Sequence, residues 1–151
     1  MIRSSLLAFA AIATIATLGL VAMPASAQTH GYKVPPSQLS KYWIRTNTHV
    51  YADAPNSGQG LKAVGCAAVS YVIGADGNTR DVKVEKVVPS TSDFQVIAKS
   101  MIQAFHYRAA DSNSHDRPVA TYFIVPFNIP TGDKATLERV LKSCHLPGYG
   151  D

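Results

Sequence analysis

Apolar and polar residues alternate along two neighbouring stretches in the middle of the chain, and this period of two predicts β-strands. Residues 63–73 read AVGCAAVSYVI, and residues 79–88 read TRDVKVEKVV, with valines alternating with charged residues. Between them, Asp76-Gly77 predicts a tight hairpin turn, because glycine accepts the positive φ that such a turn needs. The two strands are therefore expected to pair antiparallel. In the first strand, one face carries Val69, Tyr71 and Ile73, and the other carries Cys66, Ala68, Ser70 and Val72.

The period then changes to that of a helix between Asp93 and Phe105. Ser92 and Gln95 have the spacing of a capping box. A helix with one apolar face must bury that face against another element, and the hairpin offers a sheet for it. The apolar stripe consists of Phe94, Ile97, Ala98, Met101, Ile102 and Phe105.

Alternation returns over residues 119–129, which read VATYFIVPFNI. Pro126 has no N–H to donate, so it is best tolerated at the edge of a sheet, and we expect this last strand to keep one side open. A second helical pattern covers residues 133–144, where Leu137, Val140, Leu141 and Cys144 share a face.

These elements predict the fold class α+β, as a small two-layer domain. It has a three-stranded antiparallel sheet, one helix across a face, and a further helix at the C-terminus. The lead-in at residues 28–60 is partly irregular: Val34-Pro35-Pro36 is stiff and extended, residues 37–44 are expected to form a short helix, and Trp43 is expected to cover part of the core. The chain is further divided into an N-terminal segment at residues 1–27, the domain itself at residues 61–130, and a C-terminal helix and tail at residues 131–151.

The first 27 residues have the pattern of a secretory signal peptide. Arg3 precedes an apolar run at residues 6–22, and Ala25-Ser26-Ala27 ends the segment with small residues. We expect cleavage before Gln28 and export to the periplasm. The alternative is an uncleaved anchor in the inner membrane, since the run approaches the roughly 20 residues that a spanning helix needs.

Charge and composition narrow the classes of partner. The 151 residues carry a net charge of +4, but lysines and arginines are scattered rather than clustered. A nucleic-acid partner is therefore not expected.

Catalytic and metal-binding motifs are absent from the sequence: there is no H-x-x-x-H, H-E-x-x-H, C-x-x-C, G-x-S-x-G or phosphate-binding glycine loop. We expect no enzymatic activity, no cofactor and no metal site. The two cysteines predict a disulfide in an exported protein. Cys144 lies on the apolar stripe of the last helix and Cys66 lies in a strand of small residues, so a bridge would pin that helix to the sheet. The rival hypothesis is a small exported thiol or redox protein, or an enzyme, that uses Cys66, Cys144 and His145.

A series of short motifs follows in a fixed order from Gly65 to Ile129. The motifs are Gly65, Val69-Ser70-Tyr71-Val72-Ile73, Asp76-Gly77, Val82, Val84, Ser90, Phe105 to Ala110, Asp116 to Val119, and Val125 to Ile129. In this order they resemble the C-terminal domain of TonB-type energy transducers. The chain departs from the family pattern at Ala109, where the family has proline, and at Asp116, where it has glycine. We identify neither the long proline-rich spacer nor the retained membrane anchor of the transducers, so we expect a short secreted form that transmits no force.

The resemblance implies non-catalytic binding of a peptide or protein, linked to TonB-dependent outer-membrane transport. In that family, the short N-terminal box of an outer-membrane transporter pairs with the last strand by strand addition. Ala120, Tyr122 and Ile124 are the expected partner-facing residues, because Phe123, Val125 and Phe127 are expected in the core. Three alternatives stay open: a self-associating envelope domain, a homodimer, and an edge that is merely protected by Pro126, by the last helix or by the lead-in.

Overall fold

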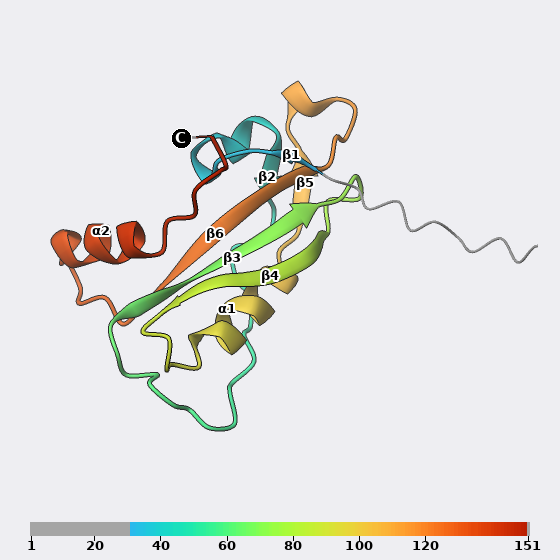
Figure 1. The fold of residues 1–151 in the computed structure, drawn as a ribbon. Coiled ribbons are helices and arrows are strands. Elements are labelled where there is room, and N and C mark those ends of the chain that lie inside the picture. Colours follow the sequence, from blue (N-terminus) through green and yellow to red (C-terminus); the bar gives the residue numbers. More distant parts are fainter. Residues whose placement is uncertain (1–30, 151) are drawn as a thin grey trace, which may run out of the picture.

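The computed structural model describes residues 31–150, so the predicted signal peptide lies outside the described residues. The long strands of its main sheet run diagonally across Figure 1, with one α-helix on each side of the sheet. In chain order, the elements are β1 (Tyr32–Lys33), the 3₁₀ helix η1 (Pro36–Lys41), β2 (Trp43–Arg45), β3 (Gly65–Ile73), β4 (Thr79–Val88), α1 (Phe94–Gln103), β5 (Tyr107–Ala109), the 3₁₀ helix η2 (Asp111–Asn113), β6 (Val119–Phe127) and α2 (Lys134–Ser143).

The predicted α+β class is confirmed, and its three antiparallel strands form the body of the main sheet. The strand order is β1-β6-β3-β4, with β3 paired antiparallel to both β4 and β6. The fourth strand, β1, was not predicted: it pairs parallel to the start of β6 over two residues. The lead-in is held there by Val34, which is buried and whose N–H donates to the carbonyl of Ala120 at 2.9 Å.

The two faces of the sheet carry separate hydrophobic clusters. The residues of β3 divide between the two faces as their alternation in the sequence predicts. Val69, Tyr71 and Ile73 belong to the larger cluster, together with the buried side of α1. Cys66 and Ala68 point to the opposite face and belong to a smaller cluster with α2. The sheet therefore lies between the two helices, and the α1 side holds most of the core.

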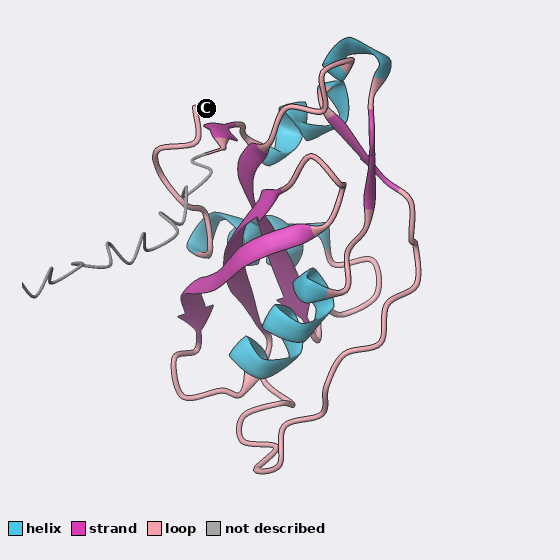
Figure 2. Ribbon diagram, turned by 90° about the vertical axis from the view of Figure 1, so that its right-hand side faces the viewer, coloured by secondary structure: helices cyan, strands magenta, loops and turns pink. Residues whose placement is uncertain are grey.

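A second, two-stranded sheet, β2–β5, stands apart from the main sheet (Figure 2). The predicted helix at residues 37–44 is thus only partly right, because η1 ends at Lys41 and the chain then becomes a strand. The third and last residue of β2, Arg45, pairs with Tyr107 of β5. Trp43 is buried as predicted, and its indole N–H donates to the carbonyl of Arg117 at 3.0 Å.

The predicted hairpin is present, but β4 is irregular. Gly77 adopts φ +75° in the turn, and a Cβ there would lie 2.0 Å from the carbonyl oxygen of Tyr107. The β3–β4 register shifts twice, once opposite Glu85 and once near Asp81, whose φ is +51°. Each shift inserts an extra residue in β4 and so reverses which residues face the core. For this reason the valines on the α1 side are Val82, Val84 and then Val87.

Helix α1 lies across the sheet with most of its predicted stripe inward. Phe94, Ala98, Ile102 and, just beyond the helix, Phe105 are buried, while Ile97 and Met101 are half-buried. The expected capping box does not form, because the Ser92 hydroxyl donates to the carbonyl of Pro89 at 2.7 Å instead.

Candidate functional site

The outer edge of β6 is the candidate functional site. Because Ala120 accepts a hydrogen bond from Val34, its main-chain groups point away from β3. Main-chain groups of alternate residues in a strand point the same way, and β6 pairs with β3 without a register shift. The main-chain groups of Ile124 and Pro126 therefore also point outward. The register of β1 stops at Ala120, so no strand within residues 31–150 pairs with the edge beyond it.

Pro126 fits this geometry. Since residue 126 points its main-chain nitrogen outward, the missing N–H removes no hydrogen bond from the sheet. The prediction that the last strand keeps one side open is right only in part, because β1 pairs with β6 at Val119 and Ala120, and the open side begins beyond them, where Pro126 lies. The proline also sets the far limit of the edge: an added strand can use the N–H and C=O of Ile124, but only the C=O of Pro126.

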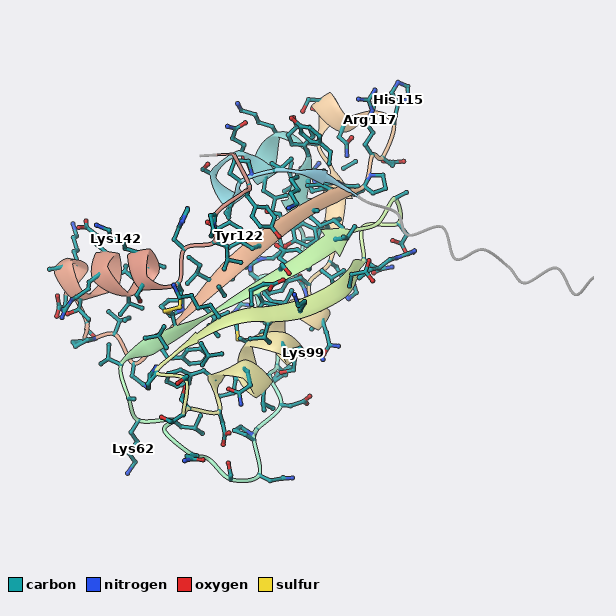
Figure 3. All side chains as sticks on the ribbon, viewed as in Figure 1. Lys62, Lys99, His115, Arg117, Tyr122 and Lys142 are labelled. Atoms are coloured by element: carbon teal, nitrogen blue, oxygen red, sulfur yellow. A yellow bond between two sulfur atoms is a disulfide. The ribbon has the colours of Figure 1, made fainter. Side chains whose placement is uncertain are left out.

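An apolar groove of about 580 Å³ runs beside this edge, between η1 and α2. In Figure 3, Tyr122 on β6 and Lys142 on α2 mark two of its walls. Ile124 lies in the groove, and its side chain packs partly against the smaller cluster under α2. The lining residues are Pro35, Pro36, Ser37, Tyr122, Phe123, Ile124, Leu141, Lys142 and His145.

A second cavity of about 280 Å³ adjoins the groove and shares Pro36, Tyr122 and Phe123 with it. It reaches into residues of the larger cluster on the α1 side. The two cavities thus border the same stretch of β6. The second is also lined by Leu39, Ser40, Trp43, Ile44, Arg45, Tyr71 and Tyr107.

Arg45 is the charged residue of this second cavity. Its guanidinium carbon lies 4.6 Å from the centroid of the Phe105 ring and 6.0 Å from that of Phe123. Such placement over aromatic faces is attractive, because the ring quadrupole presents negative charge to the cation. The side chain is exposed, so its charge faces the solvent side of the cavity.

Two of the residues that line the same cavity, Tyr71 and Tyr107, are joined through their hydroxyls. The hydroxyls of Tyr71 and Tyr107 are 2.7 Å apart and buried. Burial raises the pKa of Tyr71 well above 10, and the neighbouring Tyr107 adds to the rise, while Arg45 opposes it. Burial also raises the pKa of Tyr107, and the hydrogen bond from Tyr71 and the charge of Arg45 oppose that shift. Both tyrosines are therefore neutral donors and acceptors over the physiological range.

The charge around the edge is of one sign. Arg45 and Lys142 border the two cavities, and neither cavity is lined by aspartate or glutamate. An anionic group brought to this edge would therefore meet attraction on both sides of β6.

The opposite edge of the sheet is built differently. Strand β4 carries the two register shifts and the exposed charged residues Arg80, Lys83 and Lys86. Bulges and lysines are the devices by which natural sheets prevent another strand from pairing. Of the two edges of the main sheet, β6 is therefore the one suited to strand addition.

The three residues expected to face a partner occupy different environments. The carbonyl of Ala120 is already taken by Val34. The Tyr122 side chain is buried, with the rings of His145 and Tyr149 against it at 6.1 and 4.9 Å between centroids. Ile124 lies farther along, where its main chain is on the outer edge. Of the three residues expected in the core, Val125 is buried, and Phe123 and Phe127 pack against the core half-buried.

Sequence reasoning missed Arg45 and Lys142. Arg45 stands next to Ile44, where a helix was expected to end, and nothing local indicates that it stacks on Phe105. Lys142 could have been noticed as a basic residue in the last turn of α2.

The predicted disulfide is confirmed. Cys66 and Cys144 are bonded, with 6.2 Å between Cα atoms, and both are fully buried. These are the only cysteines in the sequence, so with the bridge formed neither sulfur is a free thiol. The bridge holds α2 against β3 and thereby fixes one wall of the groove.

Neither a metal site nor a membrane-spanning helix is found in the part of the chain that the structure describes. Within residues 31–150, no cluster of histidine, cysteine or carboxylate side chains is arranged to hold a metal ion. No helix in that range has the length and hydropathy needed to cross a bilayer.

Comparisons with known proteins gave one match that we report. No family model matches the chain, and no curated protein matches it. Among solved structures, the chain is similar to the solution NMR structure of the Pseudomonas aeruginosa TonB C-terminal domain, with 20% sequence identity and a TM-score of 0.41. The match covers 59% of this chain and 88% of that one.

Proposed function

We propose that this protein binds an extended peptide by adding it as a strand to the outer edge of β6. One observation carries the proposal: beyond Ala120 the outer edge of β6 has no paired strand within residues 31–150, and a cavity lies on each side of it. An added strand gains main-chain hydrogen bonds from the edge and sends alternate side chains to the two faces. The two cavities offer those side chains places to pack.

The role that we propose is non-catalytic. The sequence resemblance to TonB-type C-terminal domains supports a partner of a particular kind, the N-terminal box peptide of an outer-membrane TonB-dependent transporter. It also supports a place of action in the periplasm, reached through the signal peptide at residues 1–27. N-terminal sequencing of the exported protein, expected to begin at Gln28, tests the last point.

The test is a titration of isotope-labelled protein with synthetic transporter box peptides, followed by backbone amide shifts. We expect the shifts to centre on residues 122–126. Ile124→Pro removes the outward N–H and should weaken binding about tenfold, the cost of one main-chain hydrogen bond at the upper end of its range. The variant should fold, because that N–H does not bond to β3.

The matched control is Ile124→Val, which loses one methylene group but keeps the N–H. It should bind like the wild type. Equal weakening by both substitutions would mean that the side chain rather than the main chain carries binding. Saturating peptide without any shift along β6 would refute the proposal.

A further inference from the structure

We propose that Arg45 selects the peptide, and that the peptide added to β6 carries an acidic side chain that binds the Arg45 guanidinium. This inference rests on the proposed function and names the chemical class of its ligand. It assigns to Arg45 a role in specificity that the main-chain edge alone does not provide.

The first reason is that Arg45 is held in place without a polar partner. Its guanidinium stacks on Phe105 and Phe123, and within residues 31–150 it makes no salt bridge and donates no hydrogen bond. A guanidinium presents five N–H donors in a planar fork that matches a carboxylate. Because the aromatic contacts already restrict the side chain, binding a carboxylate costs little further conformational entropy.

The second reason is the position of Arg45 relative to the edge. Its cavity shares Phe123 and Tyr122 with the groove on the other side of β6. Side chains of an added strand point alternately to the two faces of the sheet. Those that point to the α1 side are directed to Arg45, and those that point to the α2 side are directed to the apolar groove with Lys142 at its rim.

The third reason is the chemistry of two residues that line the cavity. In the Tyr71–Tyr107 pair, one hydroxyl donates a hydrogen bond to the other. The hydroxyl that accepts this bond still has its own O–H proton, which the bond does not use. Both tyrosines line the cavity. A carboxylate bound to Arg45 would therefore find a second donor nearby, while no aspartate or glutamate lines the cavity to repel it.

The test is selection from a library of random peptides about eight residues long, which is long enough for one strand. The wild type should enrich peptides with aspartate or glutamate at one fixed position. For a selected peptide, replacing that glutamate with glutamine should weaken binding to the wild type about tenfold, the value of a charge-assisted hydrogen bond.

Variants of the protein separate the charge from the geometry of the guanidinium. Arg45→Gln should lose the acidic preference, so that the glutamate and glutamine peptides bind alike. Arg45→Lys keeps the charge but not the fork, and should retain a weaker preference. Lys99→Gln is the matched control: it removes the same charge from the exposed face of α1, away from the edge (Figure 3), and should select as the wild type does. Near-ultraviolet circular dichroism of Trp43 confirms that each variant is folded.

The outcomes separate this inference from the proposed function. Acidic enrichment that Arg45→Gln abolishes supports it. Two outcomes would overturn the role of Arg45 and leave strand addition standing. In both, the selected peptides bind the edge, because Ile124→Pro no longer enriches them. In the first, these peptides have no fixed acidic position; in the second, Arg45→Gln still enriches the acidic position. Both the role of Arg45 and strand addition are overturned if the wild type enriches no peptide, or if Ile124→Pro enriches every peptide that the wild type does.

Discussion

At the scale of single residues, the Tyr71–Tyr107 pair links the core to the pH of the solution. Burial raises the pKa of both hydroxyls, because it disfavours the phenolate. In the unfolded chain each tyrosine ionises near pH 10. Above that pH the unfolded chain binds fewer protons than the folded one, so the free energy of unfolding must fall as the pH rises. The stability that the pair provides is complete below about pH 10.

We therefore predict that the protein loses stability on the alkaline side, from about pH 10 upward. Replacing both residues, as Tyr71→Phe with Tyr107→Phe, removes the two ionisable groups together and should flatten this decline. Chemical denaturation at a series of pH values measures it. Tyr51→Phe is the control, since that side chain is 96% exposed and its loss breaks no buried contact. A double variant that declines as steeply as the wild type would contradict the prediction.

At the scale of elements, α1 is held by a face that the sequence pattern largely identifies. The four buried side chains of its stripe come from positions 94, 98, 102 and 105. Ile97 and Met101 share the stripe but are half-buried, so they are weaker tests of the packing than Ile102.

We predict that Ile102→Ala lowers the free energy of unfolding by about 2–5 kcal/mol, because it removes buried methylene groups and leaves a cavity. Lys99→Ala, on the exposed side of the same helix, should change it by no more than about 0.5 kcal/mol. Thermal or urea unfolding of the two variants provides the comparison. Similar losses from both would mean that α1 packs through another face.

The sequence predicts those elements that are long enough to show a period. Strands β3, β4 and β6 and both α-helices fall within two residues of their expected limits. A two-residue strand such as β1 has no period, and β2 follows η1 too closely to be separated from it. One of the two bulges of β4 lies at Asp81, which has a left-handed φ although it is not glycine. Asp116 adopts φ +48° at the place where the resembling family has glycine.

The candidate site was predictable only in part, for a related reason. Pro126 marks the edge by its own chemistry, so the open side of β6 could be expected from one residue. Arg45 acquires its place through Phe105 and Phe123, which lie far along the chain. Contacts of that kind follow from the complete topology rather than from local pattern.

At the scale of the whole molecule, the disulfide determines whether α2 stays in place. The cluster beneath α2 is small, with Val140 and Cys144 as its buried members from the helix and the turn after it. The bridge joins residues 78 positions apart. By chain entropy, a loop of that length contributes up to about 4–5 kcal/mol.

We predict that Cys66→Ala with Cys144→Ala lowers the free energy of unfolding and loosens α2 more than the sheet. Amides of α2 should exchange faster with solvent, whereas those of β3 should keep most of their protection. Hydrogen exchange resolved by residue gives the measurement, and reduction of the wild type should reproduce the result. Uniform loosening of helix and sheet would show that α2 is an integral part of the core. Since α2 forms a wall of the groove, peptide binding should weaken in the same variant.

The unequal edges of the main sheet have a consequence for assembly. In the vocabulary of polymer chemistry, a sheet with two receptive edges is a bifunctional monomer and can grow into a filament, whereas a sheet with one is a chain terminator. Strand β4, with its bulges and lysines, supplies no second receptive end. Once a strand is added at β6, the edge of the main sheet that remains the protein's own is the bulged edge of β4. Should two copies meet through β6, both remaining edges are β4, and the product is a closed pair to which no third copy can be added.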